Sequence, residues 1–158
     1  MKRTTMLAAV SAAFVMSAFV TPVDAQTMKS VAGTYTLVTN KNFGDNPRGR
    51  MILTPDGYYS NTSSVATLPK VAAGNRQKGT AEENKAILDG SITHYGRYTI
   101  DDGGKTLTMH IEGSSFPNWE GTTQKRPLRV SGDQLIYTVA TPSTGGAATP
   151  DIVWKRIK

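Results

Sequence analysis

Hydrophobic and polar side chains alternate along several short stretches of this chain, and residues typical of turns separate these stretches. Residues 33–38, GTYTLV, show the pattern clearly. A period of two indicates a β-strand with one buried face. We expect about eight such strands, over residues 33–38, 48–54, 58–64, 91–100, 105–112, 122–130, 134–140 and 151–157. Many short antiparallel strands in one small chain favour a single closed β-barrel.

The turn Thr54-Pro55-Asp56-Gly57 predicts a β-hairpin, because proline presets φ and glycine accepts a positive φ. If Pro55 and Asp56 form the loop, Leu53 lies opposite Tyr58. The other face would then carry Arg50, Ile52, Tyr59 and Asn61. Both faces hold aromatic or aliphatic residues, so the pattern leaves open which face lines the barrel interior.

A second hairpin is predicted at Asp101-Asp102-Gly103-Gly104. Pairing Ile100 with Lys105 sets Tyr98 opposite Leu107. The same register sets Gly96 opposite Met109 and His94 opposite Ile111, and these residues are expected to face inward. The opposite face, expected to face solvent, carries Tyr95, Arg97, Thr99, Thr106, Thr108, His110 and Glu112.

The strand at 122–130 places charged and apolar residues on one face. Leu128 and Val130 indicate that this face is inward, and they carry Gln124 and Arg126 inward with them. Just before this strand, Trp119 follows a corner at Pro117 and is expected either to plug the barrel end or to rim a cavity.

One short helix interrupts the strands. Thr80 and Glu83 form a capping box that begins a helix over residues 80–90, and Gly90 ends it. Its apolar patch of Ala86, Ile87 and Leu88 is too small to form a core. An irregular loop at 68–78 precedes the helix. Residues 68–89, the loop with the helix, are expected to act as a lid.

The first 25 residues have the features of a secretory signal peptide. Lys2 and Arg3 precede an apolar run over residues 6–20, and Val23-Asp24-Ala25 provides a small-x-small cleavage site. The alternative, a transmembrane anchor, is disfavoured because the run is short for a bilayer span of about 20 residues. We therefore expect a signal peptide at 1–25, one domain at 26–158, and a periplasmic or secreted protein without stable membrane insertion.

The amino-acid composition argues against several classes of function. The chain contains no cysteine, which excludes disulfides, thiolate chemistry and Cys-ligated zinc. Its two histidines, His94 and His110, lack metal-binding spacing, so no metal and no cofactor are expected. Outside residues 1–25 there are 16 basic and 11 acidic residues. The basic residues are scattered rather than clustered, which argues against a nucleic-acid partner.

Short motifs in a fixed order resemble those of the bacterial and fungal lipocalin-like domain family. They are GTYTLV at 33–38, PRGRMILTPDG at 47–57, YGRY at 95–98, EGSSFPNW at 112–119 followed by Gly121, Gln124 and Arg126, and VWKR at 153–156. The resemblance implies an up-and-down antiparallel β-barrel with a central cavity for a small hydrophobic ligand. Two positions depart from the family pattern. Tyr35 stands where tryptophan is usual, and Met109 stands where histidine is frequent.

Eight residues are candidates for contact with a ligand, and none is assigned a catalytic role. Arg126 is foremost, because an inward guanidinium needs acceptors. Its alternatives are a salt bridge to Glu112 or Glu120, or a position at the rim. The others are Gln124, Tyr98, Met109, Tyr59, Asn61, His94 and Trp119. Tyr98 could instead only pack in the interior, and Gln124 could satisfy backbone groups at the barrel end. For His94 the alternative is a partly exposed residue at the end of its strand, and the sequence favours this alternative.

Three functions fit these observations. The first is an exported carrier of a largely apolar ligand whose acidic or carbonyl group lies near Arg126. The second is a cofactor-independent isomerase or cyclase, in which Arg126 and Tyr98 polarise a carbonyl group. The third is a non-catalytic envelope protein whose barrel is filled by its own side chains. The sequence leans towards a protein that is not an enzyme, and it leaves the oligomeric state open.

Overall fold

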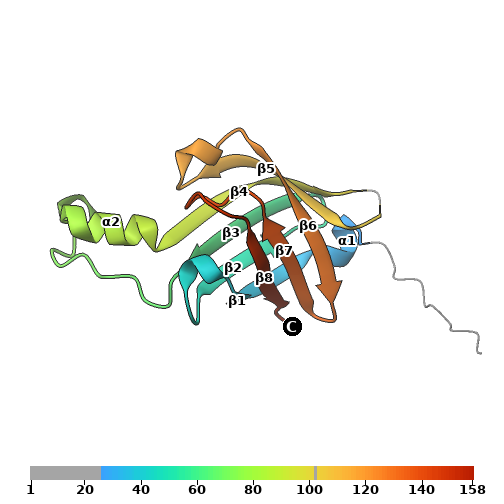
Figure 1. Ribbon diagram of the computed structural model, residues 1–158, viewed down its shortest axis with the longest axis horizontal. Coiled ribbons are helices and arrows are strands. Elements are labelled where there is room, and N and C mark those ends of the chain that lie inside the picture. The colour runs from blue at the N-terminus through green and yellow to red at the C-terminus, as the bar shows by residue number, and fades with distance from the viewer. Residues whose placement is uncertain (1–25, 102) are drawn as a thin grey trace, which may run out of the picture.

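The computed structural model describes residues 26–101 and 103–158, which form a closed barrel of eight antiparallel strands (Figure 1). Each strand pairs with its neighbours in chain order, and β8 closes the barrel against β1. The strands are β1 (Gly33–Thr39), β2 (Arg48–Leu53), β3 (Tyr58–Ser64), β4 (Ser91–Ile100), β5 (Thr106–Ser114), β6 (Thr123–Ser131), β7 (Gln134–Val139) and β8 (Thr149–Arg156). The predicted up-and-down barrel with one short inserted helix is confirmed.

Five short helical segments accompany the barrel: α1 (Met28–Val31), η1 (Lys41–Phe43), η2 (Arg76–Lys78), α2 (Ala81–Asp89) and η3 (Pro117–Trp119). Residues 1–25, where the signal peptide is predicted, lie outside the described residues. Among the helices that are described, none has the length and apolar character needed to cross a membrane.

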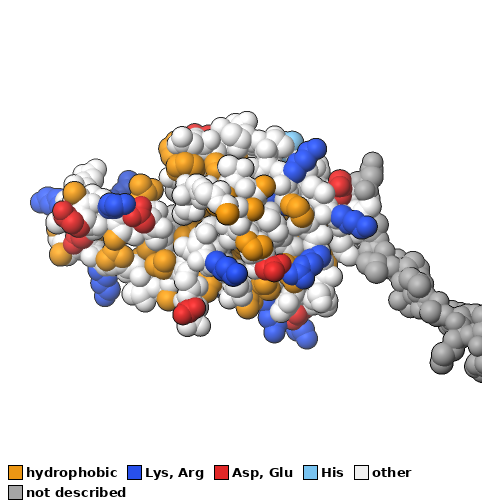
Figure 2. All heavy atoms as spheres, viewed as in Figure 1, with side chains coloured by type: hydrophobic (Ala, Val, Ile, Leu, Met, Phe, Trp, Pro, Cys, Tyr) orange, Lys and Arg blue, Asp and Glu red, His pale blue; other side chains and the backbone are white. Residues whose placement is uncertain are grey.

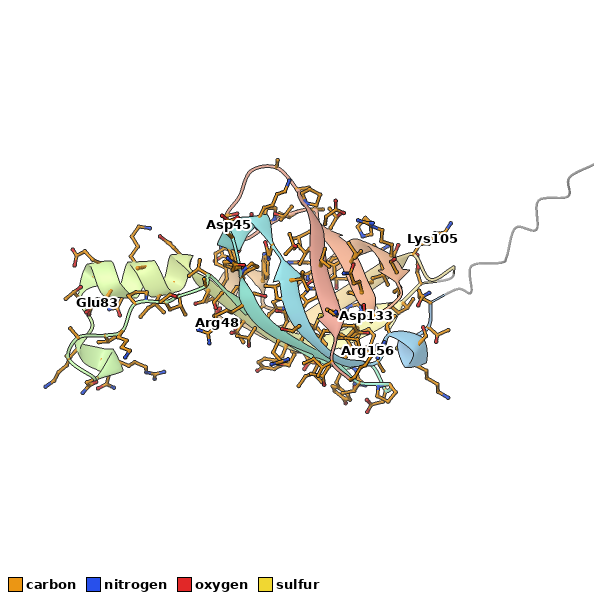
Figure 3. All side chains as sticks on the ribbon, turned by 90° about the horizontal axis from the view of Figure 1, so that it is seen from below. Asp45, Arg48, Glu83, Lys105, Asp133 and Arg156 are labelled. Carbon is orange, nitrogen blue, oxygen red and sulfur yellow. The ribbon has the colours of Figure 1, made fainter. Side chains whose placement is uncertain are left out.

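One half of the barrel interior is a packed hydrophobic core. Met51, Leu107 and Trp154 are completely buried there. The segment α1 lies at this end of the barrel, and its Val31 belongs to the same core (Figure 1). Arg156 lies beside α1 (Figure 3) and donates hydrogen bonds to the backbone oxygens of Ser30 and Ala32. Core side chains and the hydrogen bonds to α1 therefore stabilise this end of the barrel.

The register of the first hairpin differs from the predicted one. Leu53 pairs with Tyr59 rather than with Tyr58. Gly57 adopts a φ of 91°, and the Thr54 amide donates to the Tyr58 carbonyl, so the turn is one residue longer than a two-residue loop. A shift of one residue reverses the facing of one strand relative to the other. The inward face therefore carries Met51, Leu53, Tyr59 and Asn61, whereas Arg50 and Ile52 are exposed.

The register of the second hairpin differs by two residues, which leaves the facing unchanged. Ile100 pairs with Leu107 instead of Lys105, and Tyr98 pairs with Met109. The turn is longer because the Asp101 carboxylate accepts hydrogen bonds from the amides of Lys105 and Thr106. The face predicted to be inward is buried, and the opposite face, including His110, is half-buried or exposed.

A bulge between β4 and β5 then changes the pairing next to the barrel mouth. Gly96 pairs with Ile111 and Tyr95 with Gly113, so Glu112 of β5 is the extra residue. Together with the longer turn, the bulge sets His94 opposite Ser114 rather than Ile111. Gly96 has a φ of 156°, and a side chain there would overlap the His110 carbonyl oxygen, so this position requires glycine.

Strand β6 faces as predicted except at its end. Arg126 and Leu128 are buried and Gln124 is half-buried. Val130, expected to be inward, is 36% exposed because it is next to the last residue of the strand, where β6 turns into β7. On β7, the inward residues Leu135, Tyr137 and Val139 are all buried.

The helix α2 projects away from the barrel, and none of its residues is buried (Figure 1). The predicted capping box is present, with Thr80 as the N-cap and Glu83 reaching back to its amide. Figure 2 shows charged side chains gathered on this projection. The expected lid therefore stands to one side of the barrel, and only its last turn, through the exposed Leu88 and Asp89, lines the pocket described below.

Candidate functional site

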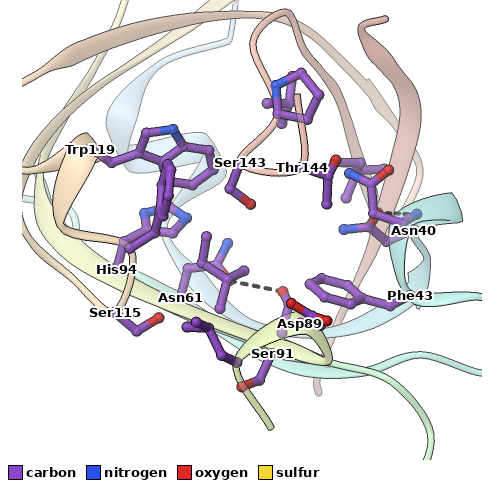
Figure 4. A pocket seen from close by; sticks show the side chains of 18 of the residues that line it. Asn40, Phe43, Asn61, Asp89, Ser91, His94, Ser115, Trp119, Ser143 and Thr144 are labelled. Atoms are coloured by element: carbon purple, nitrogen blue, oxygen red, sulfur yellow. Dashed lines mark hydrogen bonds between the residues drawn. The ribbon is translucent and has the colours of Figure 1, made fainter. Parts of the chain in front are cut away.

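A cavity of about 360 Å³ is lined in part by the last turn of α2 and opens to solvent there. In Figure 1, α2 and α1 lie at opposite ends of the molecule. The cavity volume lies in the range of pockets that hold small organic ligands. Figure 4 shows His94 and Trp119 on one wall, with Asn40 and Phe43 on the other. The cavity is lined by Asn40, Asn42, Phe43, Asn61, Ser63, Leu88, Asp89, Ser91, Ile92, His94, Ser115, Phe116, Trp119, Arg126, Tyr137, Val139, Pro142, Ser143, Thr144 and Ile152.

Arg126 lines this cavity as a buried cation that has no carboxylate partner within residues 26–101 and 103–158. Its side chain is 2% exposed, and its Nη2 donates to Gln124 Oε1 at 2.8 Å. The guanidinium carbon lies 4.9 Å from the centre of the Tyr137 ring, a cation–π contact. Arg126 takes part in none of the ion pairs among the described residues, and its Nε is buried without a hydrogen-bond partner.

The alternatives considered for Arg126 are therefore not found. Glu112 and Glu120 are both exposed, and Glu120 accepts a hydrogen bond from the Ser114 amide. Burial of a charge without a counter-ion is costly. Acceptors supplied by another molecule would offset this cost, which makes Arg126 the strongest indication of a ligand site.

His94 is buried on the cavity wall, so the expectation of a partly exposed strand-end residue is wrong. Its side chain is 2% exposed because it shares the inward face of β4 with Gly96 and Tyr98. His94 Nδ1 lies 3.0 Å from the Tyr59 hydroxyl oxygen, which fixes the ring. Burial, and secondarily the Arg126 charge, hold the pKa of His94 well below its ordinary value of 6.5. The imidazole is consequently neutral at pH 7.

Asn61, Ser63 and Tyr137 form a hydrogen-bonded chain beside the cation. Ser63 Oγ donates to Asn61 Oδ1 at 3.1 Å, and Asn61 Nδ2 donates to the Tyr137 hydroxyl at 3.3 Å. All three residues are buried. Because the serine occupies the amide oxygen, the amide nitrogen of Asn61 is directed at Tyr137. The arrangement fixes the tyrosine ring that the Arg126 guanidinium contacts.

Aromatic rings form the outer part of the cavity. Trp119, on η3, packs edge-on against His94 with ring centres 5.5 Å apart, and Phe116 packs edge-on against Trp119 at 6.0 Å. Trp119 is half-buried and lines the cavity, so it rims the cavity rather than plugging the barrel. These rings offer apolar contact area to a ligand that enters from the mouth.

Four of the candidate residues lie outside the lining. Tyr98 belongs to the packed core, where its hydroxyl donates to the Thr54 carbonyl at 2.7 Å, and burial raises its pKa to about 12. Met109 is completely buried in the same core. Tyr59 supports His94 from behind, and burial raises its pKa well above the ordinary value. Gln124 accepts the Arg126 hydrogen bond. Arg126, Asn61, His94 and Trp119 line the cavity together.

Several lining residues were not among the candidates. Tyr137 shares one face of its strand with Leu135 and Val139, and this alternation is a signal from which it could have been chosen. Phe43 comes from η1, between β1 and β2, and Ser143 and Thr144 come from the Gly-rich loop before β8. No periodic pattern marks these three residues.

The buried His94 predicts a specific pH dependence of stability. In the unfolded chain the imidazole takes up a proton near pH 6.5, whereas in the folded protein it stays neutral to lower pH. The folded state then binds fewer protons, so the free energy of unfolding falls as the pH drops below about 6.5. The slope is up to about 1.4 kcal/mol per pH unit until the folded imidazole is protonated.

Urea unfolding between pH 7 and pH 5 measures this slope. His94→Gln is expected to flatten it, and His110→Gln, on the exposed outer face, is expected to leave it unchanged. An unchanged slope in His94→Gln would contradict a neutral buried imidazole.

Comparison with known proteins agrees with this fold and cavity. Residues 21–157 match the lipocalin-like domain family. A curated relative from Aspergillus oryzae, named 4'-hydroxy-3'-methoxypropiophenone carrier protein, is 34% identical over 70 residues, which is 40% of this chain and 63% of that protein. This chain thus spans less than two thirds of that relative's length, and no solved structure matches. The family match covers nearly the whole barrel, and the chain belongs to the lipocalin-like domain family.

Proposed function

We propose that this protein is an exported carrier that holds one small, largely apolar molecule in the barrel cavity and binds its acidic or carbonyl group at Arg126. The observation that supports this most is the buried Arg126 guanidinium, which lines the cavity and has no carboxylate partner in the described part of the chain. The features of residues 1–25 support export to the periplasm or the exterior. The third hypothesis required a barrel filled by its own side chains, and a cavity of about 360 Å³ argues against it.

The fungal relative suggests a class of ligand. Its name describes a carrier of a hydroxylated, methoxylated aryl ketone, a flat molecule with an apolar ring and oxygen atoms at both ends. Such a molecule suits a cavity with aromatic rings near the mouth and hydrogen-bond donors beside Arg126. We therefore propose small oxygenated aromatic compounds as the ligand class of this protein.

Trp119→Ala tests the contribution of the aromatic wall. Loss of the indole removes apolar contact area from the cavity, and we expect the affinity for 4'-hydroxypropiophenone to fall about 10-fold or more. Because Trp119 is half-buried at the rim, the unfolding midpoint should change little. Isothermal titration calorimetry measures the affinity.

Tyr95→Ala is the matched control, since Tyr95 is an aromatic residue on the outer face, 53% exposed. It should leave the affinity unchanged. Equal affinities of Trp119→Ala and the unaltered protein would place the ligand elsewhere.

A catalytic function is the second candidate. One observation favours it: a buried neutral imidazole and a guanidinium line the same cavity, so a base and an electrophile face one space. An isomerase or cyclase would convert a bound aryl ketone during incubation with the pure protein, whereas a carrier would return it unchanged, as mass spectrometry and NMR would report.

A further inference from the structure

The charges that line the cavity do not balance. The titratable lining residues are Arg126, His94, Tyr137 and Asp89, with Tyr59 in contact with His94. The carboxylate of Asp89 is 60% exposed and binds Lys85 Nζ at 2.6 Å. His94 is neutral at pH 7, and burial opposes ionisation of Tyr59. Within the described part of the chain, the buried region around Arg126 therefore carries one positive charge and no negative charge.

The hydrogen-bonding groups near Arg126 show the same excess of donors. Its buried Nε hydrogen has no acceptor among the described residues. The Tyr137 oxygen already accepts the Asn61 amide, so the phenolic hydrogen of Tyr137 is free to donate. In the Tyr59–His94 pair only one hydrogen lies between the two atoms, so one further N–H or O–H remains in either tautomer. Donor hydrogens thus remain without an acceptor in the region around Arg126.

Resting on the proposed binding function, we propose that the cavity takes its ligand as an organic anion, an ionised phenol, enol or carboxylic acid, with Arg126 as the counter-ion. A neutral carbonyl accepts hydrogen bonds but leaves the buried charge uncompensated. An anion accepts hydrogen bonds and also compensates the buried charge. Charge-assisted hydrogen bonds are, in addition, roughly twice as strong as neutral ones. The cavity thus selects by charge as well as by shape.

The proposal also orients the ligand. A hydroxyaryl ketone of the kind named for the fungal relative meets the requirement through its phenol oxygen. The phenolate would lie against Arg126 in the interior, and the ketone chain would extend past Trp119 towards the mouth. By thermodynamic linkage, preference for the phenolate lowers the pKa of the bound phenol.

Absorption spectroscopy with 4'-hydroxypropiophenone tests the ionisation directly, because the phenolate absorbs at longer wavelength than the phenol. On binding, we expect the phenolate band to appear about one to two pH units below the pKa of the free compound, which corresponds to a 10- to 100-fold preference for the anion. Arg126→Gln should abolish this band shift. Lys125→Gln removes the same charge from the exposed face of the same strand and should retain it.

Calorimetry with a second pair of probes extends the test to carboxylates. 3-Phenylpropanoate and 3-phenylpropanamide have nearly the same shape and differ in charge. We expect the anion to bind about 10- to 100-fold more tightly, and Arg126→Gln to make the two affinities similar.

The outcomes separate this inference from the proposed function. Binding of all probes with no preference for the anion and no band shift would overturn the inference and leave the carrier function standing. Failure of every probe to bind would overturn both. An anion preference that survives in Arg126→Gln would also overturn it, because the charge responsible would lie elsewhere.

Discussion

Gly96→Ala is expected to lower the free energy of unfolding by about 3 kcal/mol or more, and the unfolding midpoint by about 10 °C. Gly96 lies at the bulge between β4 and β5 with a φ of 156°. A methyl group there overlaps the His110 carbonyl oxygen and lies 2.8 Å from the Glu112 amide nitrogen, so backbone must move. Because His94 lies two residues away on the same inward face of β4, ligand affinity should fall as well.

Gly145→Ala is the matched control for this substitution. Gly145 also has a positive φ, 71°, but a methyl group there meets nothing within 4 Å. Gly145→Ala should lower the free energy of unfolding only by the penalty of a positive φ, about 1 kcal/mol. Thermal and urea unfolding measure both variants. Equal losses in the two would show that the strand contact at Gly96 contributes nothing beyond backbone conformation.

Arg126→Met is expected to stabilise the unliganded protein by about 1–3 kcal/mol and to abolish the preference for anionic ligands. The substitution removes a buried cation that has no counter-ion, and methionine fills a similar volume without a polar atom to satisfy. Function and stability are thus opposed at this position, as they often are at binding sites.

Urea unfolding and calorimetry with 3-phenylpropanoate measure the two effects. Lys125→Met, on the exposed face of β6, should change neither the free energy of unfolding nor the affinity for 3-phenylpropanoate by a measurable amount. A marked loss of stability in Arg126→Met would contradict the account, because it would show that the guanidinium acts mainly through Gln124 and Tyr137 as a structural group.

The alternation of side chains predicted most of the barrel because strand facing depends on local pattern alone. Leu107 and Met109 alternate with Thr106 and Thr108, and the structure buries the first pair and leaves the second half-buried. The same reasoning turned Arg126 inward, since it shares a face with Leu128. A strand with one apolar face has only one way to lie on a core.

Turn lengths were less predictable, because they depend on backbone conformation that several sequences can adopt. A single extra residue at Gly57 moved Tyr59 and Asn61 to the same face as Met51 and Leu53. Asp101 lengthened the second turn by capping two amides. The bulge between β4 and β5 depends on how the two strands pair, and the sequence of either strand alone does not predict it.

The sequence did not predict which part of the barrel interior is packed and which part forms the cavity. Tyr98 and His94 lie on the same inward face of β4, yet Tyr98 is in the packed core and His94 lines the cavity. Which part of a barrel is filled depends on the volumes of side chains from all eight strands. The position of Phe43 at the mouth depends on η1, which no periodicity marks.

Native mass spectrometry of the protein purified from its own source tests the central claim most directly. The account predicts a polypeptide beginning at Gln26 with one bound small molecule, which is released on unfolding and is acidic and largely apolar. Arg126→Gln purified in the same way should lack that molecule. The account would be contradicted if the unaltered protein carried no small molecule in any preparation, or if Arg126→Gln retained it in equal amount.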